Sequence, residues 1–135
     1  MILVDSSVWI DYFRASLTPQ TDMLHALLAQ KVVAVGDLMV VEVLQGTGSD
    51  LDFAAILQLL ERVTLVTISN HDIAVLAARN YRALRTKGIT VRKTIDTLIA
   101  TRCIIDDIAL LHSDRDFQPF VDHLGLRDAM GEVAL

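Results

Sequence analysis

The sequence predicts an α/β fold, in which helices cover both faces of a central parallel sheet to give three α/β/α layers. Four short aliphatic runs alternate with segments that are long enough for helices. Each run is apolar at consecutive positions, which is typical of strands buried on both faces. Strands that alternate with helices favour a parallel sheet, because each return to the sheet requires a crossover. The predicted strands cover residues 2–4, 32–35, 63–66 and 108–111.

The segments between these runs carry the expected helices. The segment 72–87 has the clearest limits, because Ser69 and Asp72 match a capping box at its start and Gly88 supplies a stop at its end. Its apolar residues recur at helical spacing, so one of its faces is expected to pack against the sheet. The other predicted helices cover residues 8–14, 21–30, 38–45, 51–62 and 95–105.

Composition limits the organisation and the location of the chain. Its 135 residues are 53% hydrophobic and 21% charged, so we expect one folded domain over 1–135, with 128–135 as a frayed tail. No apolar run approaches the about 18 residues of a membrane span. Asp5 comes too early for a secretory leader, and the single cysteine, Cys103, fits a reducing compartment. We therefore expect a cytoplasmic protein that does not bind membranes.

Basic residues are concentrated in one stretch of an otherwise acidic chain. The net charge of −5 argues against bulk electrostatic attraction to nucleic acid. Residues 79–102 nevertheless hold seven basic residues and a single acid, Asp96. Such a stretch is either a solvated helix face or a surface that faces phosphates. The candidates for binding phosphate are Arg79, Arg82, Arg85, Arg92 and Lys93.

Four acidic residues stand where this fold could gather them. Asp5 and Asp114 follow predicted strands, and ligands of open parallel sheets bind beyond the carboxyl ends of the strands. Either residue could instead only cap a helix or a turn. Glu42 lies among aliphatic residues, where a carboxylate is costly unless it is paired, protonated, near a cation or turned to water. Asp96 begins a predicted helix and shares its apolar stripe.

Carboxylates gathered in this way predict a metal site. Like charges repel unless protons or cations lie between them, and hard oxygen ligands favour Mg²⁺ or Mn²⁺ over zinc. Carboxylate-bound metals activate water and neutralise charge on a displaced oxygen, so phosphodiester hydrolysis is the natural reaction. The histidines lack the paired spacing of a zinc site and are expected at the surface or in turns. They are His25, His71, His112 and His123.

With these acids placed, the chain resembles a PIN-domain ribonuclease, and within that group it is similar to the VapC toxins of toxin–antitoxin pairs. The resemblance rests on the order and spacing of four segments. They are ILVDSSVWI at 2–10, VEVLQG at 41–46, DTLIA at 96–100 and LHSDRDF at 111–117. His112 departs from the pattern, because many members carry Ser or Thr at this position.

The resemblance implies a PIN-like domain with an open parallel sheet of four or five strands. It also implies endoribonuclease activity on RNA through water activated by Mg²⁺ or Mn²⁺, a homodimer, and a cognate antitoxin of the VapB type. The metal-binding and catalytic roles fall on Asp5, Glu42, Asp96 and Asp114, with Glu42 acting directly or through water. Asp116 is an auxiliary candidate, and Ser6 has a supporting position at the metal site.

Two other functions remain open at this point. A degenerate domain of the same fold could bind RNA or a protein without cutting. A phosphoreceiver-type signalling domain also gathers carboxylates around Mg²⁺ at strand ends. Receivers need paired acids after the first strand, however, whereas Ser6 and Ser7 follow Asp5 here. Metal-dependent cleavage of RNA separates these alternatives.

Overall fold

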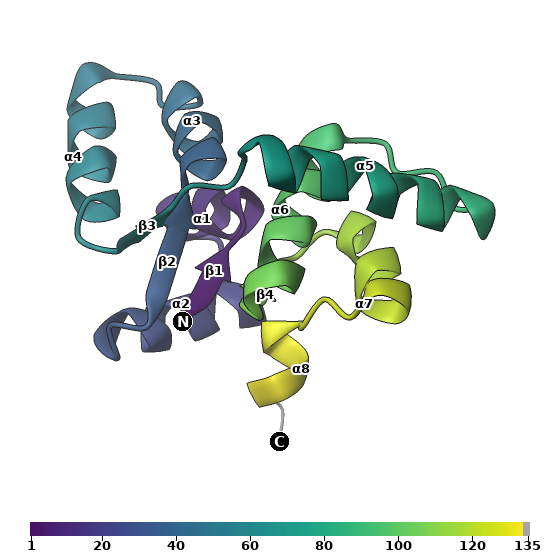
Figure 1. The fold of residues 1–135 in the computed structure, drawn as a ribbon. Coiled ribbons are helices and arrows are strands. Elements are labelled where there is room, and N and C mark those ends of the chain that lie inside the picture. Colours follow the sequence, from purple (N-terminus) through teal and green to yellow (C-terminus); the bar gives the residue numbers. More distant parts are fainter. Residues whose placement is uncertain (134–135) are drawn as a thin grey trace.

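The fold is built on one parallel sheet of four strands. A computed structural model describes residues 1–133 of the chain (Figure 1). The sheet has the strand order β3-β2-β1-β4, and each neighbouring pair is parallel. The strands are β1 (Ile2–Val4), β2 (Val33–Gly36), β3 (Thr64–Val66) and β4 (Ala109–Leu111). All four predicted strands are therefore present, with ends that differ by at most one residue.

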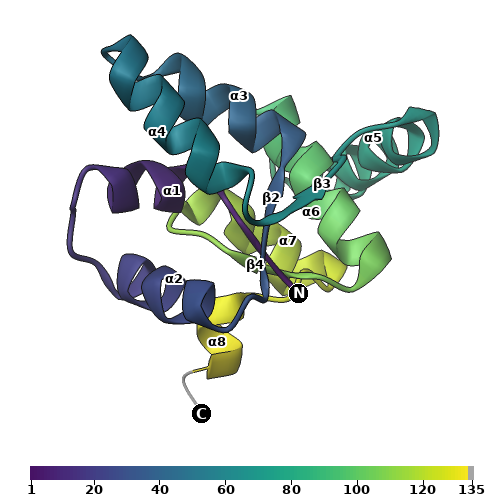
Figure 2. The same cartoon turned by 90° about the vertical axis from the view of Figure 1, so that its left-hand side faces the viewer.

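Helices connect the strands and cover the sheet. They are α1 (Ser6–Phe13), α2 (Pro19–Ala29), α3 (Asp37–Gln45), α4 (Asp50–Leu60), α5 (His71–Thr86), α6 (Thr94–Asp106), α7 (Gln118–Leu124) and α8 (Ala129–Val133), with a 3₁₀ turn, η1 (Arg115–Phe117). Figure 2 shows α1 and α2 on one side of the strands and α5 and α6 on the other. The three-layer α/β/α fold is confirmed, and the six predicted helices begin and end within two residues of their expected limits.

The start of α5 differs from the prediction. Asn70, and neither Ser69 nor Asp72, caps this helix, because the Asn70 side-chain oxygen accepts a hydrogen bond from the Ile73 N–H at 2.9 Å. The predicted capping box is therefore wrong. Asn and Ser are both preferred N-cap residues, so the adjacent pair offered two starts one residue apart. The stop at Gly88 is confirmed, since this residue has a φ of 79° directly after the helix.

The core lies around the central strands. Leu3 of β1 and Leu110 of β4 are fully buried, whereas Leu65 of the edge strand β3 is 63% exposed. The expectation that every strand is buried on both faces is therefore wrong for β3, which has β2 as its single neighbour. Cys103 is buried as a small apolar residue, and burial raises the pKa of its thiol to about 12. The largest buried side chains include Trp9, Leu24, Met39, Phe117 and Phe120.

The C-terminal segment packs against the sheet. The Leu110 N–H donates a hydrogen bond to the Arg127 carbonyl at 2.9 Å, and Ala129 in α8 is buried. Arg127 also donates two hydrogen bonds to Glu132. Residues 128–133 thus differ from the expected frayed tail, and residues 134–135 lie outside the described part. Within residues 1–133, no helix is both long and apolar enough to span a bilayer.

Candidate metal centre

The carboxyl ends of β1 and β4 bring two of the predicted acids to one edge of the sheet. The chain runs from β1 outward to β2 and β3 on one side and returns to β4 on the other, so this edge is a topological switch point. Val4 pairs with Leu111 at the ends of the two strands, and the Asp5 N–H donates to the Leu111 carbonyl at 2.9 Å. Asp114 follows three residues after β4.

Asp5 is a buried carboxylate held by Ser7, which Ser113 contacts in turn. Its Oδ2 accepts hydrogen bonds from the Ser7 hydroxyl at 2.6 Å and from the Ser7 N–H at 3.2 Å, so Asp5 also caps α1. The Ser113 hydroxyl in turn donates to the Ser7 hydroxyl at 3.3 Å. Burial raises the pKa of Asp5, and the hydrogen bonds from Ser7 oppose this effect. Capping occupies one carboxylate oxygen, so it does not exclude a second role.

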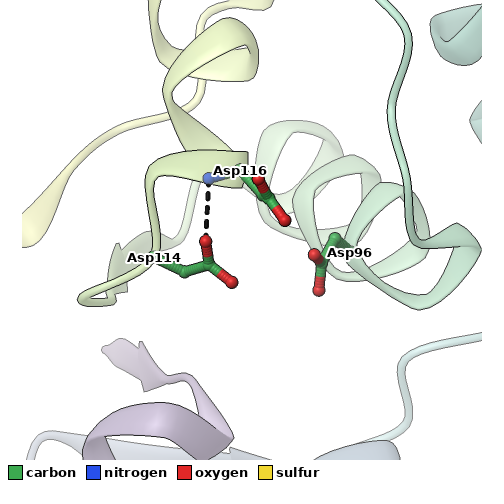
Figure 3. A group of neighbouring side chains, drawn as sticks. All are labelled: Asp96, Asp114 and Asp116. Atoms are coloured by element: carbon green, nitrogen blue, oxygen red, sulfur yellow. Dashed lines mark hydrogen bonds between the residues drawn. The ribbon is translucent and has the colours of Figure 1, made fainter.

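Three aspartates form a close group, which we call the aspartate cluster. One carboxylate oxygen from each of Asp96, Asp114 and Asp116 lies within 4.8 Å of the other two. Figure 3 shows Asp96 on α6 facing the other two aspartates, which come from the turn after β4. Asp114 Oδ1 accepts a hydrogen bond from the Asp116 N–H at 2.9 Å and caps η1. Asp114, predicted as a metal ligand, and Asp116, predicted as an auxiliary, are therefore both near Asp96.

The surroundings of Asp96 in the aspartate cluster disfavour its negative charge. The residue is 7% exposed, and its Oδ2 is buried without a hydrogen-bond partner within residues 1–133. Burial raises the pKa of Asp96 to about 6, and the negative charge of Asp5 contributes next. Lys93 opposes these effects. An ionised, unpartnered carboxylate oxygen in such a place is costly unless a proton or a cation compensates it.

Glu42 on α3 and Asp5 lie outside the aspartate cluster. The charge of Asp5 acts both on Glu42 and on Asp96 of the cluster. Glu42 is half-buried, and burial followed by the charge of Asp5 raises its pKa. A hydrogen bond from Ser6 lowers the pKa of Glu42 in turn. Asp5 therefore acts on both Glu42 and Asp96, which come from different helices. Asp5 thus links the aspartate cluster, through Asp96, with Glu42.

The predicted phosphate-binding residues separate into two sets. Arg92 forms a bidentate ion pair with Asp116, with both N–O distances at 3.0 Å, and Lys93 Nζ lies 3.8 Å from Asp114 Oδ2. These two cations partly neutralise the aspartate cluster. The other set is exposed on α5 and forms no ion pair with an acid among the described residues. It consists of Arg79, Arg82 and Arg85.

His112 lies in the connection between β4 and η1, which agrees with the expected turn position, but its side chain is buried and not at the surface. The His112 ring lies 5.1 Å from the ring of Phe117, and its Nε2 is 3.8 Å from Asp128 Oδ2. The next residue, Ser113, is linked to Asp5 through the Ser7 hydroxyl. Sequence reasoning missed Ser7 and Ser113. The sequence feature that could have identified both residues is a serine close to an aspartate just after a predicted strand.

The donor set of this region fits a divalent cation. The aspartate cluster supplies only carboxylate oxygens, which are the ligands preferred by Mg²⁺ and Mn²⁺. The buried Asp96 Oδ2 has no protein partner within residues 1–133, and a cation would provide one. The charge of Asp5 adds to the negative potential at Asp96.

Comparisons with known sequences identify the family. A family model described as the PIN domain matches residues 2–120. The chain is 31% identical over 119 residues to a VapC ribonuclease of Mycobacterium bovis, which covers 87% of this chain and 89% of the relative. Ribonuclease VapC11 of Mycobacterium tuberculosis matches with the same identity and the same coverage.

Solved structures share the fold at low sequence identity. A toxin–antitoxin complex from Klebsiella pneumoniae matches with a TM-score of 0.68 and 20% identity, over 93% of this chain and 95% of that chain. FitAcB from Neisseria gonorrhoeae matches with a TM-score of 0.68 and 16% identity, over 95% and 96% of the two chains. VapBC2 from Rickettsia felis, bound to a promoter DNA fragment, matches with a TM-score of 0.67 and 18% identity, over 87% of this chain and 92% of that chain. On its sequence and on its fold, the chain belongs to the PIN domain family, and within it to the VapC group.

Proposed function

We propose that this protein is a Mg²⁺- or Mn²⁺-dependent endoribonuclease that acts as the toxin of a toxin–antitoxin pair. The observation that carries the proposal is the buried Asp96 oxygen, which has no protein partner within residues 1–133 and faces two further aspartates. Membership of the VapC group supports this activity, because the relatives are named ribonucleases. It also removes the phosphoreceiver alternative, which belongs to a different fold family.

The residues that we expect to hold the cation are the acids of one sheet edge. Asp5, Asp96 and Asp114 are the principal candidates, Glu42 acts directly or through water, and Asp116 is auxiliary. A bound divalent cation would lower the pKa of a water molecule and neutralise charge on the departing oxygen. Hydrolysis of this kind leaves a 5′-phosphate and a 3′-hydroxyl and does not need the ribose 2′-hydroxyl.

The remaining polar residues of the site position these acids. The hydrogen bonds from Ser7 fix the Asp5 carboxylate at the end of β1, and Ser113 fixes the Ser7 hydroxyl. Ser6 supports Glu42 from the first turn of α1. Arg92 and Lys93 lie beside Asp116 and Asp114, where they can also meet the phosphates that flank the cleaved bond.

Protein partners form the second part of the proposal. Several apolar side chains are exposed around α4 and β3, among them Leu51 at 80% and Leu65 at 63%. Single exposed apolar side chains are common on protein surfaces, so the partners are inferred from membership of the VapC group and from the structural neighbours, which are toxin–antitoxin complexes. We propose a cognate VapB-like antitoxin and a second copy of this chain as the partners. A cytoplasmic location remains a prediction and agrees with an RNA substrate.

Cleavage of an RNA panel by the purified full chain tests the activity. Short labelled RNAs drawn from transfer, ribosomal and messenger sequences are incubated with Mg²⁺ or Mn²⁺, and in parallel with EDTA. We expect metal-dependent cleavage that leaves 5′-phosphate ends. The variant Asp96→Asn should retain the fold and lose at least about a hundredfold in rate, since loss of outer partners of metal ligands alone costs about 10–100-fold.

The matched control is Asp72→Asn, which makes the same change at an exposed position on α5, outside the acidic site. This variant should cleave as the unaltered protein does. Undiminished metal-dependent cleavage by Asp96→Asn would remove Asp96 from the site. Binding of RNA without cleavage in any metal would favour the remaining alternative, a degenerate domain that binds RNA or a protein.

A further inference from the structure

We propose that Arg92 competes with the divalent cation for Asp116, and that it thereby limits how tightly the metal centre binds its metal. This inference rests on the proposed function and deepens it, because it names a residue that regulates the same site. Arg92 lies in the loop directly before α6, four residues ahead of Asp96. The chain thus supplies a cation of its own to the aspartate cluster.

The hydrogen bonds of Asp116 differ from those of the other two aspartates in the cluster. Both Asp116 oxygens accept a hydrogen bond from the same guanidinium nitrogen of Arg92, each at 3.0 Å. Asp96 Oδ2, in contrast, is buried without a partner within residues 1–133. Asp114 Oδ2 faces Lys93 Nζ at 3.8 Å, which is beyond hydrogen-bond distance. Asp116 is therefore the member of the cluster whose two oxygens are already engaged by a cation.

A divalent cation at the cluster needs an oxygen that Arg92 holds. Asp116 contributes one of the three oxygens that lie within 4.8 Å of one another, and in Figure 3 its carboxylate points towards Asp96. Because both of its oxygens bind Arg92, the oxygen that completes this group is a shared one. The positive charge of Arg92 also repels a divalent cation at close range. Binding of Asp116 by either cation therefore opposes binding by the other.

The ion pair between Arg92 and Asp116 is placed where it can be exchanged. The Arg92 side chain is 76% exposed, whereas that of Asp116 is 19% exposed. Separation of a buried pair leaves a charge without solvent, but Arg92 can turn into water without this cost. Exposed ion pairs change an equilibrium constant by at most a factor of about five. Arg92 is therefore expected to weaken metal binding without preventing it.

Arg92 acts on the whole aspartate cluster. The hydrogen bond to Asp116 is the main cause that raises the pKa of Arg92, and the charges of Asp114 and Asp96 contribute further. The guanidinium consequently neutralises part of the charge that would attract a metal ion. Removal of Arg92 should leave the cluster more negative and Asp116 unpaired, and both changes favour a divalent cation.

The test is a calorimetric titration of the metal-free full chain with Mn²⁺ at neutral pH. A salt concentration of about 0.15 M gives a Debye length of about 8 Å, so distant exposed charges contribute little. Arg92→Gln removes the charge and keeps a polar side chain, and it should bind Mn²⁺ about three- to tenfold more tightly than the unaltered protein. If Arg92 only supported its loop, its loss would disorder the acids and weaken binding. The sign of the change thus separates the two roles.

The matched control is Arg62→Gln, which makes the same change at an exposed position just before β3. Because the strands are parallel, Arg62 lies at the opposite end of the sheet from the acids. Its Mn²⁺ affinity should stay within about twofold of that of the unaltered protein. Arg92→Lys keeps the charge and should resemble the unaltered protein more closely than Arg92→Gln does. Far-ultraviolet circular dichroism checks that each variant is folded.

A double-variant cycle tests whether the competition passes through Asp116. Asp116→Asn removes the charge that Arg92 and the metal share. If Arg92 acts by holding this carboxylate, Arg92→Gln should change the Mn²⁺ affinity of the Asp116→Asn protein by less than about twofold. Electron paramagnetic resonance of free Mn²⁺ measures the same affinities where binding is too weak for calorimetry.

The outcomes separate this inference from the proposed function. If the unaltered protein binds Mn²⁺ and Arg92→Gln binds it equally or more weakly, the inference is wrong and the nuclease proposal stands. An equal gain in affinity with and without Asp116 would also overturn it, because the effect would then be one of general charge. Mn²⁺ binding by Arg92→Gln alone would support the competition. If neither protein binds Mn²⁺, the metal centre and this inference both fail.

Discussion

The Asp96 carboxyl group is unusual because its surroundings disfavour its charge. Burial is the larger cause and the charge of Asp5 the next, and together they raise its pKa to about 6. The sequence placed this residue at a helix start on an apolar stripe and among the candidate metal ligands. The sequence could not predict that Arg92 pairs with Asp116 or that Ser7 holds Asp5, because these contacts depend on loop paths and side-chain rotamers.

This pKa predicts that the metal-free protein loses stability as the pH rises. Below 3.8, the ordinary pKa of an aspartate, Asp96 is protonated in the folded and the unfolded chain. Between 3.8 and about 6 the folded chain keeps the proton that the unfolded chain releases, so the free energy of unfolding falls through this range. The loss amounts to at most about 3 kcal/mol. Burial raises the pKa of Asp5 and Glu42 in the same direction.

Urea unfolding in EDTA at about pH 4 and about pH 7 checks this expectation. Asp96→Asn cannot titrate at this position, so its stability should decline less than that of the unaltered protein. At neutral pH without metal, the variant should be the more stable of the two. The assignment of the raised pKa would be wrong if both proteins became equally more stable towards neutral pH.

At the scale of single elements, the cap of α5 offers a direct test of the corrected helix start. Asn70→Ala removes the acceptor for the Ile73 N–H and should lower the free energy of unfolding by about 0.5–2 kcal/mol. Ser69→Ala should leave it nearly unchanged, because Ser69 does not cap the helix. Chemical denaturation measures both variants. A larger loss for Ser69→Ala than for Asn70→Ala would restore the capping box predicted from the sequence.

The turn from β2 into α3 depends on a glycine. A Cβ atom at Gly36 would lie 2.7 Å from Ile68 and from Met39, both of which are fully buried. Gly36→Ala should therefore destabilise the fold by about 1–3 kcal/mol, as overpacking does. Gly48→Ala is the matched control, because a Cβ there meets no atom within 4 Å. Equal unfolding midpoints for the two variants would contradict the close packing at this turn.

The elements were predicted with different success for physical reasons. Long periodic segments such as α5 and the consecutive apolar runs of β1 and β4 are local signals, so the sequence predicted them well. The turn η1 and the helices α7 and α8 follow Asp114, where no long period marks them, and they were not predicted. The exposure of Leu65 could not be predicted either, because a strand's position at the sheet edge depends on the whole topology.

For the whole molecule, the parallel topology brings distant acids to one place. Asp5 and Asp114 come to the same end of the sheet because β1 and β4 are neighbours, although more than a hundred residues separate them in the chain. α6 adds Asp96 to the group, and α3 places Glu42 within the field of Asp5. The three-layer fold and the resemblance to the family predicted this convergence. The close group of three, with Asp116 included, required the structure.

The central claim is that the carboxylates gathered at this end of the sheet bind a divalent cation, Mg²⁺ or Mn²⁺. Calorimetric titration of the metal-free protein with Mn²⁺ at neutral pH tests it most directly, with Asp96→Asn as the site variant and Asp72→Asn as the matched control. The account predicts saturable Mn²⁺ binding by the unaltered protein and by Asp72→Asn, and binding weakened at least about tenfold in Asp96→Asn. No Mn²⁺ uptake by the unaltered protein, or equal uptake by Asp96→Asn, would contradict the account.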